Sequence, residues 1–336
     1  MTIEIGGDIV TTILLRAQVV ALVMLLAVGA RAATVWECYI YNPVATLPSV
    51  QGIVRLIDRV KQQTNGELEI NLHLGGSLPI KASDITAAVG DNVVQLGDDG
   101  FATGTIPITA ILRLPMLLQS YQDLDKAMAI LRPHLDEAYG KRGIVVLGQY
   151  AYPFQVIWGK KKITSLDDIK GLKLRVTSVE QGEFVRRFGG VSLPLGSPDV
   201  AAALDRGVVD GVFTASSGGG LTWHDLLKYR YAFPTSYVNS TIVVNREAFE
   251  KLPLATQKFL RDAGADSATW ATAEMQRQED EVTARFGKEG MILTDASPAE
   301  VKEATEKLRP YWDEWATKHS AEAVSILKEI RAAIGR

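Results

Sequence analysis

The residues that decide the fold lie in one stretch, Leu166–Thr214, which reads LDDIKGLKLRVTSVEQGEFVRRFGGVSLPLGSPDVAAALDRGVVDGVFT. It contains three short runs of β-forming residues, Leu172–Val176, Val191–Leu195 and Val208–Phe213, separated by two segments of helical length. Strands that alternate with helices in this way build parallel βαβ units. The stretch therefore predicts an α/β protein with a parallel sheet.

Both helical segments begin with a recognisable signal. Ser178, with Gln181 three residues later, matches a capping box at the start of the first helix. Ser197 followed by Pro198 predicts a serine cap for the second helix, with proline at the first helical position. Two capped helices between three strands support a βαβαβ arrangement.

Arg175 is the candidate ligand-binding residue of this stretch. Parallel strands joined by right-handed crossovers end at one edge of the sheet, where open α/β sheets bind their ligands. Within Leu172–Val176, Arg175 alternates with three apolar residues, so its side chain points away from the face that they bury. A guanidinium there offers parallel donors that suit a carboxylate. The alternative is a solvated arginine that pairs with a nearby acid.

The order of several motifs along the chain resembles the extracytoplasmic solute-binding proteins of TRAP transporters, the DctP-like family. These motifs are DIKGLKLRV, a Gly-Gly, a Leu-Pro, AALDRGVVDG, LLKY and VVNREAFEKLP, and the similarity extends from about Val35 to at least Gly290. The resemblance implies a two-lobed periplasmic-binding-protein fold with a ligand cleft between the lobes and a long helix, Leu254–Lys288, across both. It also implies that Arg175 binds the carboxylate of a small organic anion, which the protein delivers to the TRAP membrane permease subunits.

Further ligand contacts are expected where other strands end at the same edge. The loop after Asn92–Leu96 and the turn after Val35–Tyr41 should face the cleft from the first lobe, and the chain should cross between the lobes just before Pro153–Trp158. The resemblance places an aromatic contact near Phe101 and a polar or basic one at the hinge. Besides Arg175, the candidates are Tyr39, Asp98, Phe101, Phe154, Gln155, Phe213, Thr214, Tyr237 and Asn239.

Some of these candidates have a second interpretation. Asp98 is typical of a solvated turn, because aspartate favours turns. Tyr237 and Asn239 lie where a strand begins and are also explained as ordinary polar residues at a strand end.

The predicted neighbours of Arg175 indicate a class of ligand. After Val-Asp-Gly the resembled family commonly has an acidic or glutamine-like residue and then asparagine, whereas this chain has Phe213 and Thr214. One guanidinium beside Phe213, Phe154 and Tyr237 predicts a monocarboxylate with an apolar or aromatic body rather than a C4-dicarboxylate.

Residues 1–32 match a secretory signal peptide, with Arg16 before the apolar run Val19–Val28 and a small-residue cleavage pattern after it. The run is too short to span a bilayer, and an uncleaved anchor is the alternative. The signal predicts export to the periplasm. By the resemblance, residues 33–152 with about 240–285 form the first lobe, and residues 153–239 with about 286–336 form the second.

The composition is that of a globular protein without a nucleic-acid partner. The chain of 336 residues has 36 basic and 39 acidic side chains and a formal net charge of −3 at pH 7, which does not favour nucleic acid or an anionic membrane. The single cysteine, Cys38, lies in an apolar run and is expected to be a buried free thiol. We find no motif for a cofactor or a metal.

No enzyme motif is complete in the sequence, and we predict that the protein is not an enzyme. The best enzymatic alternative is an exported serine hydrolase that uses Ser216 or Ser217 with His224, although no nucleophile elbow surrounds these serines. Another alternative is a ligand-sensing module that feeds a receptor. Residues 214–220, TASSGGG, lack the Gly-Lys-Ser/Thr of a phosphate loop and are expected to form a flexible loop with exposed amides before a helix over Leu221–Lys228.

Overall fold

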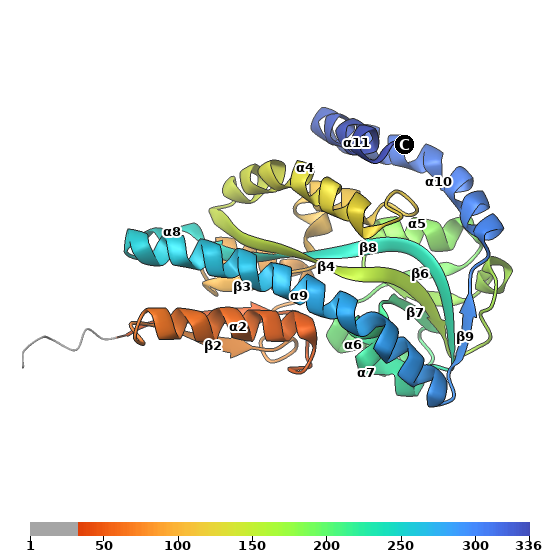
Figure 1. Cartoon of the computed structure of the whole chain (residues 1–336), viewed down its shortest axis with the longest axis horizontal. Helices are drawn as coiled ribbons and strands as arrows, with labels where there is room; N and C mark the ends of the chain where they lie inside the picture. The colour runs from red at the N-terminus through yellow and green to blue at the C-terminus, as the bar shows by residue number, and fades with distance from the viewer. Residues whose placement is uncertain (1–32) are drawn as a thin grey trace, which may run out of the picture.

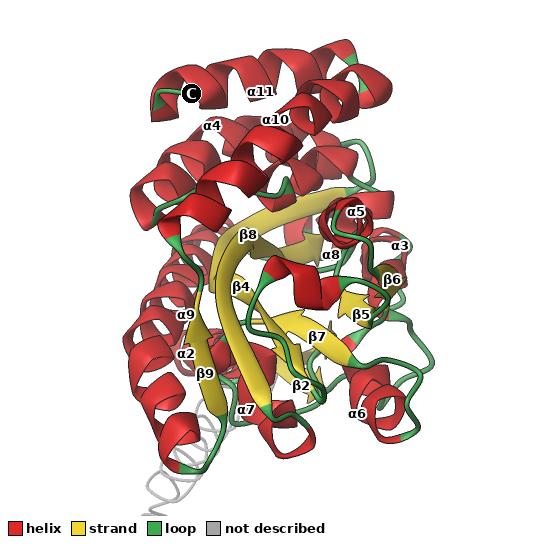
Figure 2. Ribbon diagram, turned by 90° about the vertical axis from the view of Figure 1, so that its right-hand side faces the viewer, coloured by secondary structure: helices red, strands yellow, loops and turns green. Residues whose placement is uncertain are grey.

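The computed structural model describes residues 33–336, and the predicted signal peptide lies outside this range. One twisted, mixed sheet runs through the described part of the chain (Figures 1 and 2). The helices α4, α10 and α11 cover one side of it, and α2 and α9 run along another (Figure 2). The predicted α/β class is confirmed.

The strands follow the order β2-β1-β3-β8-β4-β7-β5-β6 across the sheet, and β9 pairs with β8. The strands are β1 Thr34–Ile40, β2 Leu68–His73, β3 Leu96–Asp99, β4 Ile144–Gly159, β5 Lys173–Val176, β6 Val191–Pro194, β7 Gly211–Thr214, β8 Tyr229–Asn245 and β9 Ile292–Asp295. The helices are α2 Pro48–Gln63, α3 Ile85–Gly90, α4 Tyr121–Gly140, α5 Val179–Arg187, α6 Ser197–Asp205, α7 Leu221–Trp223, α8 Arg246–Glu250, α9 Leu254–Lys288, α10 Pro298–His319 and α11 Ala321–Ile334.

Two long strands, β4 and β8, join two groups of shorter strands. In one group β1 is parallel to β2 and β3, and β3 pairs with the end of β8. In the other group β5 is parallel to β6 and β7, and β7 pairs with the end of β4. Because β4 and β8 pair with each other along most of their length, they carry the chain through both groups (Figure 1). The residue ranges expected for the two lobes stay a prediction.

The sequence predicts one strand over Ile144–Gln149 and another that begins at Pro153–Trp158, and this was wrong, because β4 is continuous from Ile144 to Gly159. The ladder between β4 and β8 shifts its register between Tyr152 and Gln155. Proline cannot donate to a ladder and is tolerated at such an irregularity. The bulge therefore absorbs Pro153 without ending the strand.

The predicted βαβαβ unit is confirmed as β5-α5-β6-α6-β7, with parallel strands. Ser178 caps α5 and accepts a hydrogen bond from the backbone N–H of Gln181, whereas the side chain of Gln181 accepts from the N–H of Thr177 instead of closing on the cap. The expected serine cap of α6 was wrong, because Gly196 occupies the cap position and Ser197 is the first helical residue.

The long helix α9 has the predicted bounds and packs against β4 and α2 (Figure 1). Gly264 allows this close approach, because a Cβ at this position would lie 2.6 Å from the Cβ of Leu147. On the strand, a Cβ at Gly148 would lie 2.5 Å from the carbonyl oxygen of Gly264. Two glycines in contact thus set the distance between the helix and the sheet.

Two adjacent carboxyl groups are buried at the end of β3. Asp98 accepts hydrogen bonds from Tyr150 at 2.8 Å and from Ser240 at 2.5 Å, and Asp99 accepts one from Thr86 at 2.5 Å. Burial raises the pKa of Asp98 to about 7 and that of Asp99 to about 6, and their mutual repulsion adds to the effect for Asp98. The solvated-turn interpretation of Asp98 was therefore wrong.

Cys38 lies buried in β1 as a free thiol, as predicted. Over residues 33–336, none of the helices combines the length and the apolar character that crossing a membrane requires.

We predict that Gly264→Ala lowers the free energy of unfolding by about 1–3 kcal/mol, because overpacking against Leu147 outweighs the higher helix propensity of alanine. Gly287→Ala on the same helix is the matched control. Its new Cβ would lie 2.9 Å from Cδ1 of the exposed Leu293, whose side chain can move. We therefore expect this variant to be at least as stable as the wild type. Urea denaturation measures both, and equal stability of the two variants would contradict the close approach.

A second prediction concerns pH. Because the pKa values of Asp98 and Asp99 are raised in the folded state, the stability that they contribute is fully present below their unfolded pKa and is lost as the pH rises through about 6 to 7. We expect the free energy of unfolding to fall by about 3 kcal/mol between pH 5 and pH 8. Urea denaturation at several pH values should show a shallower fall for Asp98→Asn, and an unchanged slope would refute this account.

Candidate functional site

A cavity of about 470 Å³, including its mouth, lies where the carboxyl ends of β1, β3, β5 and β7 meet. Both groups of strands contribute to its wall. The lining residues are Tyr41, Asn42, Pro43, Phe101, Tyr152, Gln155, Arg175, Thr177, Ser197, Thr214, Gly219, Thr222, Trp223 and Val238.

Arg175 is held at the end of β5 by backbone oxygens and an aromatic ring. Its side chain is buried, and its Nε donates to the carbonyl of Leu195 at 3.0 Å. Its Nη1 donates to the carbonyl of Phe213 at 3.4 Å, and the guanidinium carbon lies 5.1 Å from the ring centre of Trp223. These contacts fix the orientation of the planar group while leaving further N–H donors for a ligand.

The charge of Arg175 has no counterion among the residues that the structure describes, because no Asp or Glu lines the cavity and no carboxylate pairs with the guanidinium. Burial lowers the pKa of Arg175 to about 10, and the nearby charge of Arg113 acts in the same direction. The group therefore stays protonated at pH 7. An uncompensated buried charge costs several kcal/mol, and an anionic ligand would offset this cost.

Hydroxyl and amide groups line the wall near Arg175. The phenol oxygens of Tyr41 and Tyr152 lie 2.8 Å apart, and Nδ2 of Asn42 donates to Tyr152 at 2.9 Å. Thr177 and Thr214 add hydroxyls from the ends of β5 and β7. A polar part of a ligand can thus be recognised beside its anionic group.

The structure brings four of the predicted residues together at this cavity: Phe101, Gln155, Arg175 and Thr214. Tyr39 instead lines a neighbouring hollow, where its hydroxyl donates to the carbonyl of Ile80 at 2.8 Å.

Three predicted aromatic residues lie outside the cavity. The ring of Phe213 is buried against Phe184, and only its carbonyl reaches Arg175. Phe154 and Tyr237 stack on each other with ring centres 4.2 Å apart. Both pack in the core, because the bulge in β4 displaces the register that the sequence implied.

Two predicted polar residues also lie outside the cavity. Asn239 is occupied by the buried guanidinium of Arg113, which donates to its side-chain oxygen at 3.3 Å and to its carbonyl at 2.7 Å. Asp98 is bound by Tyr150 and Ser240 within the sheet. We do not include these five outlying residues in the proposed contact set.

Several lining residues were not named as contacts from the sequence. Tyr41, Asn42 and Thr177 lie in segments that the carboxyl-edge rule placed at the cleft, although only Tyr39 and Arg175 of these segments were named. Tyr152 lies between the two strands expected from the sequence. Trp223 lies in the helix predicted over Leu221–Lys228, which was not expected to line the site.

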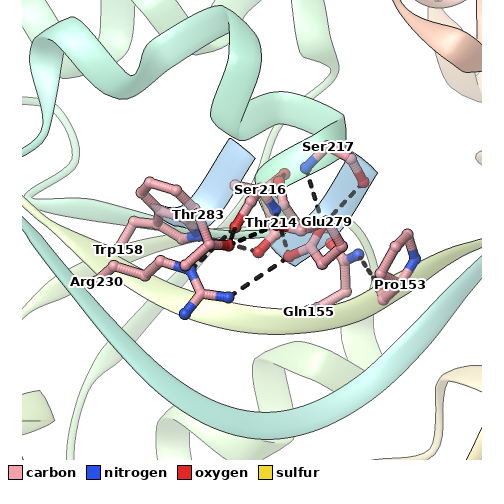
Figure 3. Close-up of polar contacts among 10 residues, drawn as sticks. Pro153, Gln155, Trp158, Thr214, Ser216, Ser217, Arg230, Glu279 and Thr283 are labelled. Carbon is pink, nitrogen blue, oxygen red and sulfur yellow. Dashed lines mark hydrogen bonds and ion pairs between the residues drawn. The ribbon is translucent and has the colours of Figure 1, made fainter. Parts of the chain in front are cut away.

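A buried cluster fixes the segment that follows β7 (Figure 3). Glu279 of α9 accepts hydrogen bonds from the backbone N–H groups of Ser216 at 2.9 Å and Ser217 at 2.8 Å, and from the hydroxyl of Ser217 at 2.8 Å. Arg230 of β8 pairs with Glu279 at 3.4 Å and donates to the Ser216 hydroxyl at 3.0 Å. The long helix thereby positions the segment that carries Thr214 and Gly219 into the cavity wall.

The prediction of a flexible glycine-rich loop was wrong. A Cβ at Gly219 would lie 2.3 Å from the ring of Trp223, and one at Gly220 would lie 3.1 Å from the ring of Trp158. Residues 216–218 and 220 are buried, so their amides are not exposed. The glycines are required because two tryptophan rings pack directly on the backbone. The predicted helix is also shorter, with α7 ending at Trp223.

The residues considered for a serine hydrolase are engaged elsewhere. Ser216 contacts Arg230 and Thr283, and Ser217 donates to Glu279. His224 stacks on Phe286, and its Nε2 lies 3.3 Å from Asp225 rather than next to either serine. Within residues 33–336, no cluster of three or more His, Cys, Asp or Glu side chains could hold a metal ion.

Comparisons with known proteins agree on one family. The family model described as bacterial extracellular solute-binding protein, family 7 (DctP) matches residues 42–319. The C4-dicarboxylate-binding periplasmic protein DctP of Rhodobacter capsulatus is 23% identical over 295 residues, which cover 85% of this chain and 87% of that protein.

Solved structures show the same architecture. DctP7 of Bordetella pertussis, an extracytoplasmic solute receptor binding pyroglutamic acid, is 27% identical, with a TM-score of 0.83 over 89% of this chain and all of that one. DctP6 of the same organism, also a receptor binding pyroglutamic acid, is 25% identical with a TM-score of 0.83 and the same coverage. The fold is shared with a TRAP periplasmic solute-binding protein of Sulfitobacter with bound β-D-galacturonate. That protein is 19% identical, with a TM-score of 0.80 over 89% of this chain and all of that one.

The two-lobed fold with a cleft is thereby confirmed. With a family model that covers residues 42–319 and relatives that match along nearly their full length, the chain belongs to family 7 of the bacterial extracellular solute-binding proteins, the DctP family of TRAP transporter solute receptors.

Proposed function

We propose that this receptor binds a small organic acid through Arg175 and delivers it to a TRAP membrane permease. The observation that carries the proposal is the buried guanidinium of Arg175, which faces a cavity without a counterion among the described residues. A ligand carboxylate would restore neutrality and accept two parallel hydrogen bonds from the guanidinium. The hydroxyl of Thr214, which donates only a long bond of 3.3 Å to the carbonyl of Ala215, would turn to the ligand beside it, whereas Thr177 donates its proton to Gln181 at 2.7 Å.

The ligand is a monocarboxylate with a compact, partly polar body. Arg175 is the only charged side chain among the described residues that line the cavity, so a second carboxylate would be buried without a partner. The aromatic walls come from Tyr41, Phe101, Tyr152 and Trp223 rather than from the aromatic residues that the sequence indicated. They would cover the faces of a small ring.

L-Pyroglutamate is the first candidate. It combines one carboxylate with a five-membered lactam ring, which matches one guanidinium surrounded by aromatic rings and hydroxyls. Two receptors of Bordetella pertussis that are 25% and 27% identical to this chain bind pyroglutamic acid.

Export and partnership follow from the same role. A TRAP solute receptor works outside the cytoplasm, and we propose that residues 1–32 are the signal peptide that sends the chain to the periplasm. The proposed partner is the membrane permease. A sensing module that feeds a receptor would use the same cavity, and pull-down of the permease subunits with ligand-loaded protein would distinguish the two. An exported hydrolase is not favoured, because its candidate serines and histidine do not meet.

We predict that Arg175→Met abolishes binding of L-pyroglutamate, with the dissociation constant raised at least about 30-fold, because 2–5 kcal/mol of charge pairing is lost. Without ligand, this variant should unfold at the same temperature as the wild type or a higher one, since an apolar side chain of similar volume replaces a buried unpaired charge. Isothermal titration calorimetry and thermal unfolding measure the two effects.

Arg206→Ala, which removes an exposed arginine of the same region, is the control and should change neither quantity. Arg175→Lys should bind with intermediate affinity, because lysine keeps the charge but not the planar fork. Unchanged affinity in Arg175→Met would refute the anchor. Binding of succinate or malate in preference to L-pyroglutamate would refute the monocarboxylate.

The cluster around Glu279 generates a further prediction. Glu279→Gln should lower the free energy of unfolding by about 3 kcal/mol, because Arg230 is left buried without a counterion. It should also weaken ligand binding, because the segment with Thr214 and Gly219 loses its attachment to α9. Glu281→Gln, an exposed neighbour on the same helix, serves as the control. If both variants bind and unfold alike in calorimetry and urea denaturation, Glu279 does not position the wall.

A further inference from the structure

A chain of hydrogen bonds connects the buried Asp98 with the cavity wall. Tyr150 donates to Asp98 at 2.8 Å, its oxygen lies 3.4 Å from that of Tyr41, and Tyr41 lies 2.8 Å from Tyr152. Asn42 donates to Tyr152 at 2.9 Å. Asp98 and Tyr150 lie outside the cavity, whereas the other three residues line it. The anchor mechanism does not use this chain.

An ionised Asp98 fixes the direction of the bond from Tyr150 and favours the same direction in the two bonds between phenols, in which either oxygen can be the donor. Each phenol has one proton. An ionised Asp98 can only accept, so Tyr150 donates to it and offers its own oxygen to Tyr41. When Tyr41 donates to Tyr150, its oxygen accepts from Tyr152, and all three protons point toward the negative charge, an arrangement in which each bond strengthens the next. Asn42 supports this direction, because its amide donates to the oxygen of Tyr152.

The two phenols at the cavity then have oxygen lone pairs, and no protons, to offer a ligand. They lie close enough to the Arg175 guanidinium that both influence its pKa. The cavity would thus present donors from Arg175 to the anionic group and acceptors from Tyr41 and Tyr152 to another part of the same small molecule.

We infer that Asp98 is a positioning residue of the ligand site. Through Tyr150 it turns the hydroxyl protons of Tyr41 and Tyr152 away from the cavity. The site thereby selects an organic acid that carries an N–H or O–H donor. This inference rests on the proposed function and specifies its ligand. It also makes selectivity depend on pH, because a protonated Asp98 can itself donate and no longer fixes the direction of the chain.

Few titratable groups lie close to Asp98. Asp99 follows on the same strand, Cys38 faces Asp98 from β1, and Tyr150 and Tyr152 approach from β4 with Tyr41 beside them. Ser240 of β8 is not titratable in this range. The thiol and the phenols have pKa values raised by burial, so they stay neutral over the range in which the carboxyls titrate.

A ligand-free measurement tests the chain itself. In protein labelled with ¹³C at the tyrosine Cζ, the signals of Tyr41 and Tyr152, assigned with Tyr→Phe variants, should shift between pH 5.5 and 8.5 with the midpoint of the Asp98 carboxyl. Asp98→Asn should remove this shift. Asp99→Asn, which removes the neighbouring acid outside the chain, should keep it. Signals that do not move while Asp98 titrates would overturn the inference.

A pair of matched probes tests the selection of a donor. L-Pyroglutamate has a ring N–H, and 5-oxotetrahydrofuran-2-carboxylate has a ring oxygen in the same place. At pH 8 the wild type should bind the lactam about ten- to a hundredfold more tightly than the lactone, since an unpaired buried acceptor costs about 1–3 kcal/mol. Tyr150→Phe, which disconnects Asp98 from the other two phenols but keeps the carboxyl group and its hydrogen bond from Ser240, should reduce this ratio several-fold, as should pH 5.5.

The outcomes separate the two proposals. An unchanged ratio in Tyr150→Phe overturns the inference while the anchor role of Arg175 stands. If the wild type binds neither probe, the proposed ligand and the selection of a donor fail together, and the ligand-free titration alone then decides whether Asp98 orients the phenols.

Discussion

The structure depends on the buried positive charge of Arg175, which faces the cavity and which no side chain of the described residues neutralises. A guanidinium in the interior is costly, and Arg175 is kept there by two backbone carbonyls and the face of Trp223. Dipoles and an aromatic ring hold its position without cancelling its charge. An anion that enters the cavity would neutralise this charge, which supports the proposal of an organic-acid receptor.

The strands and the helix around Arg175 are regular except where the ladder between β4 and β8 shifts its register. The long strands β4 and β8 run through both groups of strands, and α9 packs on them at the contact between Gly148 and Gly264. The ladder between β4 and β8 loses its regular register between Tyr152 and Gln155, two residues that line the cavity. The ligand site therefore lies where the shared strands are least regular. Glu279 reaches from α9 to the segment after β7 and ties the other wall to the same frame.

Charge is distributed unevenly around the site. Arg175 stands alone in the cavity, whereas Arg230 has its partner in Glu279 and Arg113 is satisfied in part by Gly100 and Asn239. Two carboxyls at the end of β3 are buried close to this region without entering the cavity. Their raised pKa values mean that the folded protein holds protons near neutral pH that the unfolded chain would release. The phenols of Tyr150, Tyr41 and Tyr152 connect the carboxyl group of Asp98 with the cavity wall.

The sequence by itself determined the α/β class, the parallel βαβαβ unit and the long helix α9, and it placed Arg175 at the edge where the parallel strands end. These features depend on periodicity, terminal signals and the rule that parallel strands end at one edge. Thr214 was placed at the cavity by the same rule, whereas Phe101 and Gln155 were named from the family resemblance. Only the tertiary structure decided that Phe154 and Tyr237 pack against the core, that Asp98 is buried, and that Gly219 and Gly220 lie under tryptophan rings. The physical reason is that a bulge shifts which face each residue of a strand presents, and that burial and pairing arise from segments distant in the chain, which local pattern cannot specify.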